Sequence, residues 1–133
     1  MPKTIIQSDR AWRSRLPFAQ ATLAGGIFQC CSVGYDQRGM LVGPGDIRAQ
    51  TRQTLKNVAI LLAEAGGELR DVTKCTVYLT DRANYDGMNE VFFSIFAEQA
   101  PLRATILCQL AFPELLVEVD ATAWLGSESA GFA

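Results

Sequence analysis

Two carboxylates near the C-terminus are the side chains of this sequence best placed for acid–base chemistry. Residues 115–124 alternate apolar and polar side chains, which is the period of a strand with one buried face. Glu118 and Asp120 therefore share a face, about 6.5–7 Å apart along the strand. Because the chain has no histidine, proton transfer has to use carboxylates, Tyr, Lys, Cys, backbone groups or water. Leu116 and Trp124 lie on the same face, which favours a surface covered by another subunit over a plain solvent face.

Arg103 is the candidate partner for an anion. It begins a predicted strand over 103–111, and the other side chains on its face are uncharged. Such an arginine either forms an ion pair within the fold or anchors an anionic ligand through its planar guanidinium. The residues alone leave both alternatives open.

The cysteines follow the pattern of neither a zinc site nor a disulfide framework, because no C-x-x-C spacing occurs. Cys75 and Cys108 are predicted to be small core residues. Cys30 and Cys31 are adjacent on a predicted strand, so they point to opposite faces, and one can be buried while the other lines a cleft. A thiol nucleophile at either position would have no histidine to activate it.

Asn89 lies among the aromatic residues of a predicted helix, as either a surface amide or a cleft residue. The chain contains neither G-x-x-x-x-G-K-S/T nor G-x-G-x-x-G, so a nucleotide-binding loop is not expected. Without histidine there is no His-ligated zinc site. We expect no metal and no cofactor.

Two helices and five strands are predicted to position these residues. The helices span 46–65 and 83–98, with Asp46 and Asp81 as N-caps and Gly66-Gly67 as a left-handed stop. The strands are predicted at 18–23, 27–33, 72–80, 103–111 and 115–124. The order β-β-α-β-α-β-β places both helices on one face of a single mixed or antiparallel sheet, an α+β fold.

The last two predicted strands are candidates for a hairpin that turns at 112–114. This hairpin would place Arg103 opposite about residue 123 and some 16 Å from Glu118, at about 3.3 Å per residue. If both side chains serve one pocket, we therefore expect them to come from different chains.

Length and composition indicate one domain of 133 residues with a tail from residue 126 that frays. Hydrophobic residues make up 49% of the chain, which favours an oligomer in which partners cover apolar surface. A net charge of −2 disfavours nucleic-acid binding, and the basic residues Arg48, Arg52 and Lys56 are expected on a solvated helix face. No apolar run reaches roughly 18 residues, and the first ten residues lack the apolar core of a signal peptide. We expect a cytoplasmic protein without membrane partners.

Seven segments taken together resemble the RidA/YjgF family, in its order and spacing, from about residue 16 to 124. They are 17–21 (PFAQA), 45–51 (GDIRAQT), 65–74 (AGGELRDVTK), 77–81 (VYLTD), 89–92 (NEVF), 101–105 (PLRAT) and 116–119 (LVEV). The resemblance implies a chorismate-mutase-like fold that assembles as a homotrimer with three clefts between subunits. It also implies that the partner is a small carboxylate substrate and that no cofactor is used.

The resemblance further implies site residues. Arg103 matches the family arginine that grips the substrate carboxylate, and Glu118 matches the acid near the attacking water. Asn89 matches a helix asparagine that borders the cleft, and Phe18 stands where the family often has Tyr or Phe. The chain departs from the family at three positions of the cleft wall, where Cys30 and Cys31 replace a Ser-Gly pair and Thr105 stands for cysteine.

The activity implied is hydrolytic deamination of small imino or enamino acids, such as 2-iminopropanoate or 2-iminobutanoate, to keto acids and ammonia. The changed cleft wall leaves two alternatives. One is a pathway-specific enamine deaminase acting on aminoacrylate or 2-aminomuconate. The other is a trimer that binds a ligand or acts like a chaperone without catalysis. Ribonuclease activity, sometimes ascribed to this family, is disfavoured by the acidic balance and the missing histidine.

Overall fold

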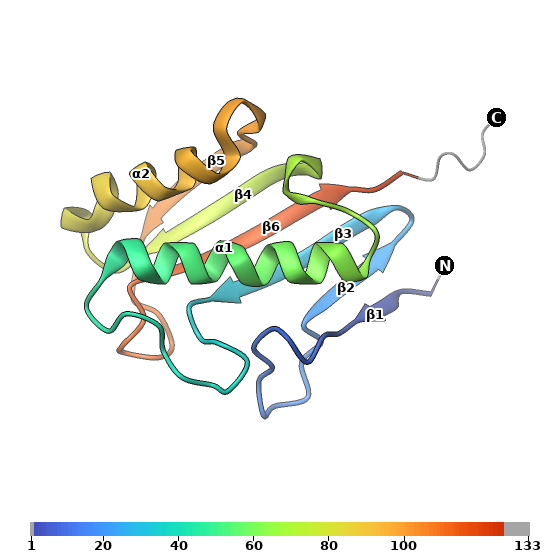
Figure 1. Ribbon diagram of the computed structural model, residues 1–133, viewed down its shortest axis with the longest axis horizontal. Coiled ribbons are helices and arrows are strands. Elements are labelled where there is room, and N and C mark those ends of the chain that lie inside the picture. The colour runs from blue at the N-terminus through green and yellow to red at the C-terminus, as the bar shows by residue number, and fades with distance from the viewer. Residues whose placement is uncertain (1, 127–133) are drawn as a thin grey trace.

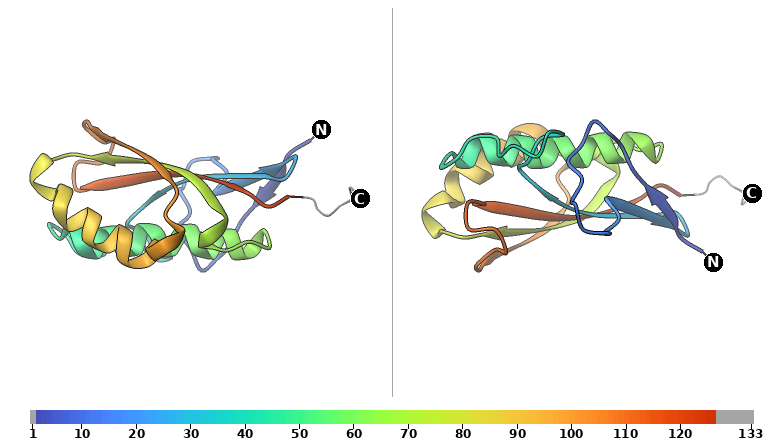
Figure 2. Two further views of the ribbon diagram at one scale, coloured as in Figure 1. Left: turned by 90° about the horizontal axis from the view of Figure 1, so that it is seen from above. Right: turned by 90° about the horizontal axis from the view of Figure 1, so that it is seen from below.

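The computed structural model describes residues 2–126, which form a six-stranded sheet with two helices on one face (Figures 1 and 2). The strands are β1 (Thr4–Ile6), β2 (Ala21–Ala24), β3 (Ile27–Val33), β4 (Val72–Leu79), β5 (Leu102–Leu107) and β6 (Val117–Trp124), and the helices are α1 (Ile47–Glu64) and α2 (Tyr85–Phe96). Three short 3-10 turns, η1 (Leu69–Asp71), η2 (Arg82–Asn84) and η3 (Ala97–Gln99), join these elements. The predicted α+β class with a mixed sheet is confirmed. Strand β1 was not predicted, and the fraying predicted for the tail lies outside the described residues except at Gly126.

The helix ends follow the predicted capping residues. The Asp46 carboxylate accepts a hydrogen bond from the Ala49 amide at the start of α1, and Gly66 follows the helix with a φ of +88°. Helix α2 is shorter than predicted because both of its ends continue as 3-10 turns. The Asp81 carboxylate caps η2 through the Ala83 amide rather than α2 itself. Where the two helices meet, a Cβ on Gly87 would approach Ile47 Cγ2 to 2.8 Å, so a side chain there would force them apart.

The β2–β3 hairpin forms as predicted. Gly25 and Gly26 connect the strands with φ of +56° and +80°, and positive φ at both central residues is what a tight type I′ hairpin turn requires. The turn sets the register, so Ala21 pairs with Cys30.

The predicted hairpin of 103–111 with 115–124 is wrong. The strand order is β1-β2-β3-β6-β4-β5, so β6 pairs antiparallel with both β3 and β4, whereas β5 runs parallel to β4 at the edge. Alternate residues of β6 are fully buried, but most of β5 stays exposed, which explains why β6 takes the central place. Helix α2 supplies the crossover that a parallel β4–β5 pair needs.

The sheet has one covered and one open face (Figure 2). Val117, Val119, Ala121 and Ala123 of β6 are at most 2% exposed and belong to the core between the sheet and the helices. The alternate residues of β6 point to the open face, where no helix of the described chain lies. No helix among residues 2–126 is both long and apolar enough to cross a bilayer.

Candidate active site

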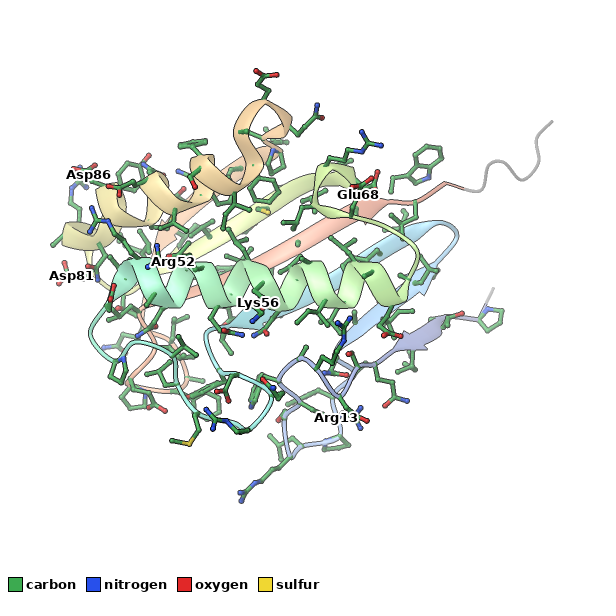
Figure 3. The ribbon with its side chains drawn as sticks, viewed as in Figure 1. Arg13, Arg52, Lys56, Glu68, Asp81 and Asp86 are labelled. Carbon is green, nitrogen blue, oxygen red and sulfur yellow. The ribbon has the colours of Figure 1, made fainter. Side chains whose placement is uncertain are left out.

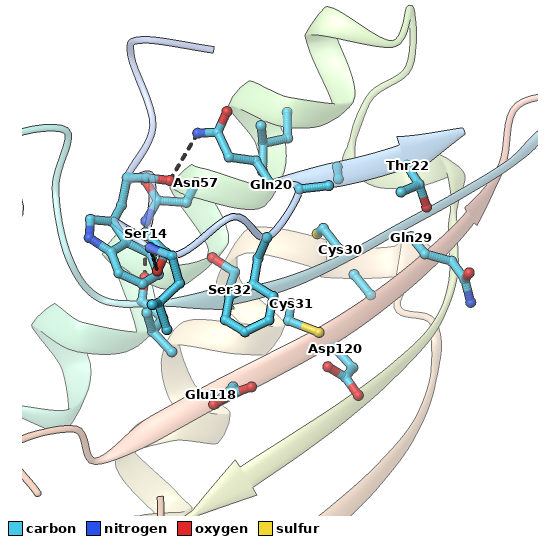
Figure 4. A pocket seen from close by; sticks show the side chains of 18 of the residues that line it. Ser14, Gln20, Thr22, Gln29, Cys30, Cys31, Ser32, Asn57, Glu118 and Asp120 are labelled. Atoms are coloured by element: carbon cyan, nitrogen blue, oxygen red, sulfur yellow. Dashed lines mark hydrogen bonds between the residues drawn. The ribbon is translucent and has the colours of Figure 1, made fainter. Parts of the chain in front are cut away.

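A cavity of about 750 Å³ lies over the open face of β3 and β6 (Figure 4), within the range of small-molecule sites. Phe18, in the segment before β2, contributes an aromatic side chain that is 69% exposed. Cys31 from β3 and Glu118 and Asp120 from β6 form the polar end of the cavity. The structure thus brings four of the predicted site residues, Phe18, Cys30, Cys31 and Glu118, to one cavity.

At the polar end of the cavity, the thiol of Cys31 and the carboxylates of Glu118 and Asp120 lie close together. The Cys31 sulfur and one carboxylate oxygen each of Glu118 and Asp120 all lie within 4.8 Å of one another. Sheet register causes this, because Cys31 is the cross-strand partner of Asp120 and Tyr78 is that of Glu118. The Tyr78 hydroxyl donates to Asp120 Oδ2 over 3.2 Å.

Burial and the two neighbouring carboxylates shift the proton equilibria of this group. Removal from water, and next the charge of Asp120, raise the pKa of Glu118 above its ordinary value. Removal from water, followed by a hydrogen bond to Asp120 and the charges of Asp120 and Glu118, raises the pKa of Cys31 to about 12. The raised pKa favours the thiol form of Cys31, which makes it a weak nucleophile. The spacing of this group would suit a cation, but a thiol that keeps its proton is a poor metal ligand, so we infer no metal centre from it.

The adjacent cysteines point to opposite faces, as predicted. Cys31 is exposed on the open face, whereas Cys30 is 6% exposed and packs in the core, although it borders the same cavity. Burial raises the pKa of the Cys30 thiol well above its usual range. Cys75 is also a core residue, as predicted, and Cys108 is half-buried.

The predicted arginine lies on the other face of the sheet, under α2. Arg103 is half-buried, and its guanidinium carbon lies 4.8 Å from the ring centre of Phe92, 5.3 Å from that of Phe93 and 5.9 Å from that of Tyr85. Its Nη1 donates only to the Met88 sulfur, at 3.7 Å. The ion pairs formed among residues 2–126 do not include Arg103. Arg103 therefore forms no structural salt bridge with the described residues.

Asn89 and Thr105 accompany the arginine. Asn89 follows Tyr85 by four residues and precedes Phe92 by three, so it shares the α2 face that covers Arg103. Its Oδ1 is buried and has no hydrogen-bond partner among the described residues. Thr105 is half-buried on β5, two residues beyond Arg103 and on the same side of the strand.

Arg103 and Glu118 cannot serve one site within one chain. Arg103 pairs in register with Cys75, a core residue of the helix-covered face. Glu118 lies between the buried residues Val117 and Val119 along β6, so it points the opposite way. The distance between Arg103 and Glu118 that was estimated from the predicted hairpin no longer applies. The two side chains are nevertheless separated, because they lie on opposite faces of the sheet.

Sequence reasoning missed part of each region. Asp120 was recognised as a neighbour of Glu118 but not as a site residue, and Tyr78 was not singled out. The i, i+2 spacing of two carboxylates on a strand was the available signal for Asp120. No sequence spacing indicated that aromatic rings of α2 would lie against Arg103, because that contact depends on β5 packing beside α2.

The basic residues of α1 are exposed, as predicted (Figure 3). Arg48 forms an ion pair with Glu90 on α2 at 2.9 Å, and Arg52 and Lys56 extend from the same helix away from the sheet. Exposed pairs of this kind contribute little to stability. Nothing in this face gathers the further cations that a phosphate backbone would need.

The chain is similar over nearly its whole length to known proteins. The sequence model described as endoribonuclease L-PSP matches residues 9–125. RidA from the Antarctic bacterium Psychrobacter is 28% identical, with a TM-score of 0.85 over 91% of this chain and 98% of that one. The Rid-family protein YyfA from Yersinia pestis is also 28% identical, with a TM-score of 0.87 over 92% and 99% of the two chains.

A third solved structure, TdcF from E. coli with bound serine, is 26% identical, with a TM-score of 0.84 over 92% of this chain and 99% of that one. The strand order and the helix-covered face thus recur in proteins that share about a quarter of their residues with this chain. With a family model that spans both regions of the candidate site, the chain belongs to the endoribonuclease L-PSP family, which includes the RidA (YjgF) proteins.

Proposed function

We propose that this protein is a cytoplasmic homotrimeric deaminase that hydrolyses small imino or enamino acids to keto acids and ammonia. Each active site would lie between two protomers, with Arg103 from one and Glu118 from the next. The observation that carries the proposal is a half-buried guanidinium that lies over aromatic rings and has no carboxylate partner among residues 2–126.

The setting of Arg103 suits an anchor for a small carboxylate. Stacking over Phe92 and Phe93 attracts the cation and holds the guanidinium plane in place, so little side-chain freedom would be lost on binding. Only one weak sulfur acceptor occupies its donors. A substrate carboxylate would receive two parallel N–H···O bonds from this fork.

Asn89 supports the same assignment. A buried carbonyl without a donor costs about 1–3 kcal/mol, so native proteins seldom leave one unpaired. A substrate N–H group held beside Arg103 would supply the missing donor.

The open sheet face supports assembly. It carries exposed apolar side chains, including Ile106 (44%) and Trp124 (62%), in addition to the acidic side chains that line the cavity. Exposed apolar patches of this kind mark interaction surfaces. A neighbouring protomer docked there would bring its Arg103 close to Glu118 and Asp120. The positive charge of the arginine would then be paired with the negative charge of the carboxylates.

The chemistry then needs no histidine. Arg103 would orient the imino acid, and water would add to the C=N carbon to form a carbinolamine. Glu118 would hold that water, pass a proton to the amino nitrogen as the C–N bond breaks, and take back the hydroxyl proton as the C=O bond forms. The products are one keto acid and one ammonia, and the protein returns to its starting state.

The test compares Arg103→Ala with Arg103→Lys, which keeps the charge but loses the fork. Ammonia release above the spontaneous rate would be measured for imino acids generated in situ by an amino-acid oxidase. Loss of a charge-assisted bidentate contact is expected to lower kcat/KM roughly 100-fold in the alanine variant and less in the lysine variant. Arg52→Ala, on the exposed face of α1, is the matched control and should retain activity. Unchanged turnover in Arg103→Ala would overturn the mechanism.

A pathway-specific enamine deaminase is the second candidate. It is favoured by the Cys31 thiol, which stands in the cavity where the resemblance implies glycine. Assaying iminobutanoate, aminoacrylate and 2-aminomuconate side by side separates it from a generalist. Carboxylate binding without ammonia release from any of them would identify a non-catalytic trimer instead.

A further inference from the structure

We propose that Asp120 is a positioning residue that makes Glu118 the proton-carrying carboxyl of the open-face pair. The inference deepens the function proposed above and rests on it for its catalytic meaning. It is carried by the unequal hydrogen bonding of two carboxylates that lie side by side on β6.

Asp120 is contacted from both neighbouring strands. The Tyr78 hydroxyl, on β4, donates to its Oδ2 at 3.2 Å, and the Cys31 sulfur, on β3, lies within 4.8 Å of one of its carboxylate oxygens. Donors to a carboxylate favour its charged form. The Glu118 carboxylate accepts no hydrogen bond among the described residues, so nothing comparable holds its charge.

No cation of the described chain relieves the repulsion. The groups that face Glu118 are Asp120 on its own strand, Cys31 on β3 and Tyr78 on β4, and none of them is cationic. Lys74 lies farther along the open face of β4 and forms no ion pair with either acid. Charge repulsion within 4.8 Å disfavours ionisation of both carboxylates, and the one without donors is the one that keeps a proton to higher pH. The raised pKa of Glu118, caused by burial and by Asp120, agrees with this assignment.

The consequence is a general acid where a deaminase needs one. A Glu118 carboxyl can transfer its proton to the carbinolamine nitrogen as the C–N bond breaks, and the resulting carboxylate accepts the hydroxyl proton as the C=O bond forms. The remaining Asp120 carboxylate would not touch the substrate. It would act only by keeping the proton on its neighbour.

The test is a titration of Glu118 in the intact protein, using glutamate labelled with carbon-13 at the side-chain carboxyl and assigned with Glu118→Gln. In Asp120→Asn we expect the pKa of Glu118 to fall by about one pH unit, and in Asp120→Glu to stay close to the wild-type value. Glu64→Gln, which removes an exposed carboxylate at the end of α1, controls for net charge and should leave the pKa unchanged. In the proposed trimer a neighbouring Arg103 would lower this pKa in all variants alike, so the difference isolates Asp120.

A Glu118 pKa that is the same in wild type and Asp120→Asn overturns the inference, whatever the activity. If the pKa falls, the limb of the pH–rate profile that Glu118→Gln abolishes should move to lower pH in Asp120→Asn and recover in Asp120→Glu. Circular dichroism and the oligomeric mass verify that both variants fold and assemble. A titration that behaves as expected in a protein without deaminase activity would refute the proposed function and leave the Asp120–Glu118 coupling standing.

Discussion

The two faces of the sheet carry side chains of opposite charge. On the helix-covered face, Arg103 is a cation that lies on aromatic rings without an anion. On the open face, Glu118 and Asp120 are acids that crowd together without a cation. Within residues 2–126 neither group of charges has a partner of opposite sign, although most buried charges in folded proteins find their partners within reach.

The difference shows why the site cannot be understood from one protomer. A strand sends successive side chains to opposite faces, so the sheet itself separates the groups. In the proposed trimer, a second copy of the chain, placed with its covered edge against this open face, would bring an arginine to the acids. Changes to either face should therefore affect the proposed site in different ways.

Mixing two inactive variants should give the largest effect. If each site takes Arg103 from one protomer and Glu118 from its neighbour, every mixed trimer of Arg103→Ala and Glu118→Gln chains contains one intact site. Random mixing after refolding should then restore about a quarter of wild-type ammonia release. Mixing Arg103→Ala with the double variant is the control, because no intact site can form there. Recovery equal to that control would show that the two groups do not meet across chains.

A substitution of Phe18 tests the part of the proposed site that lies on the open face of the sheet. Its ring is 69% exposed at the cavity, so covering it on substrate binding or assembly should be favourable. Phe18→Ala is expected to raise KM about tenfold, which corresponds to partial burial of an aromatic side chain. Met40→Ala removes a similarly exposed side chain outside the cavity and should leave KM unchanged. Equal effects of the two changes would argue against Phe18 as part of the site.

A comparison of Asn57 with Asn89 can distinguish an amide that stabilises the fold from one that binds substrate. Asn57 donates through Nδ2 to the carbonyls of Val33 and Tyr35, whereas the buried Oδ1 of Asn89 has no partner. Asn57→Ala should lower the free energy of unfolding by about 2 kcal/mol, because two buried carbonyls lose their donor. Asn89→Ala removes a buried carbonyl without a donor, so it should not lower stability, and it should weaken substrate binding about fivefold. Denaturant titration and KM measured on both variants check the contrast, and a loss of stability in Asn89→Ala would contradict it.

The smallest effect concerns stability and pH. Because the pKa of Glu118 is raised, the folded protein binds this proton more tightly than the unfolded chain does. The contribution of Glu118 to stability is therefore present at low pH and is lost as pH rises through its folded pKa. Glu118→Gln should raise the thermal midpoint by about 2 °C at pH 8 and by nothing near pH 4. A gain of the same size at both pH values, or a similar gain in Glu64→Gln, would show that another cause is at work.

Much of the fold was predictable because local rules fixed it. The Asp46 cap, the Gly66 stop and the Gly25-Gly26 turn act within a few residues, and the structure confirms all three. The alternation of β6 likewise predicted which of its residues are buried. The pairing of β5 was not predictable in this way, because the choice between a hairpin and a parallel edge depends on which strand gains more by burial.

From the sequence alone came the candidate site residues, the lack of histidine and the two-faced character of the strand at 117–124. These follow from residue types and from the period of two, which no packing can change. Tertiary structure decided that β6 lies at the centre and β5 at the edge, so that Arg103 falls under α2 and Glu118 on the bare face. The reason is physical: burial is a property of the whole sheet, and charge partners are set by what packs together in space rather than by what is near in the chain.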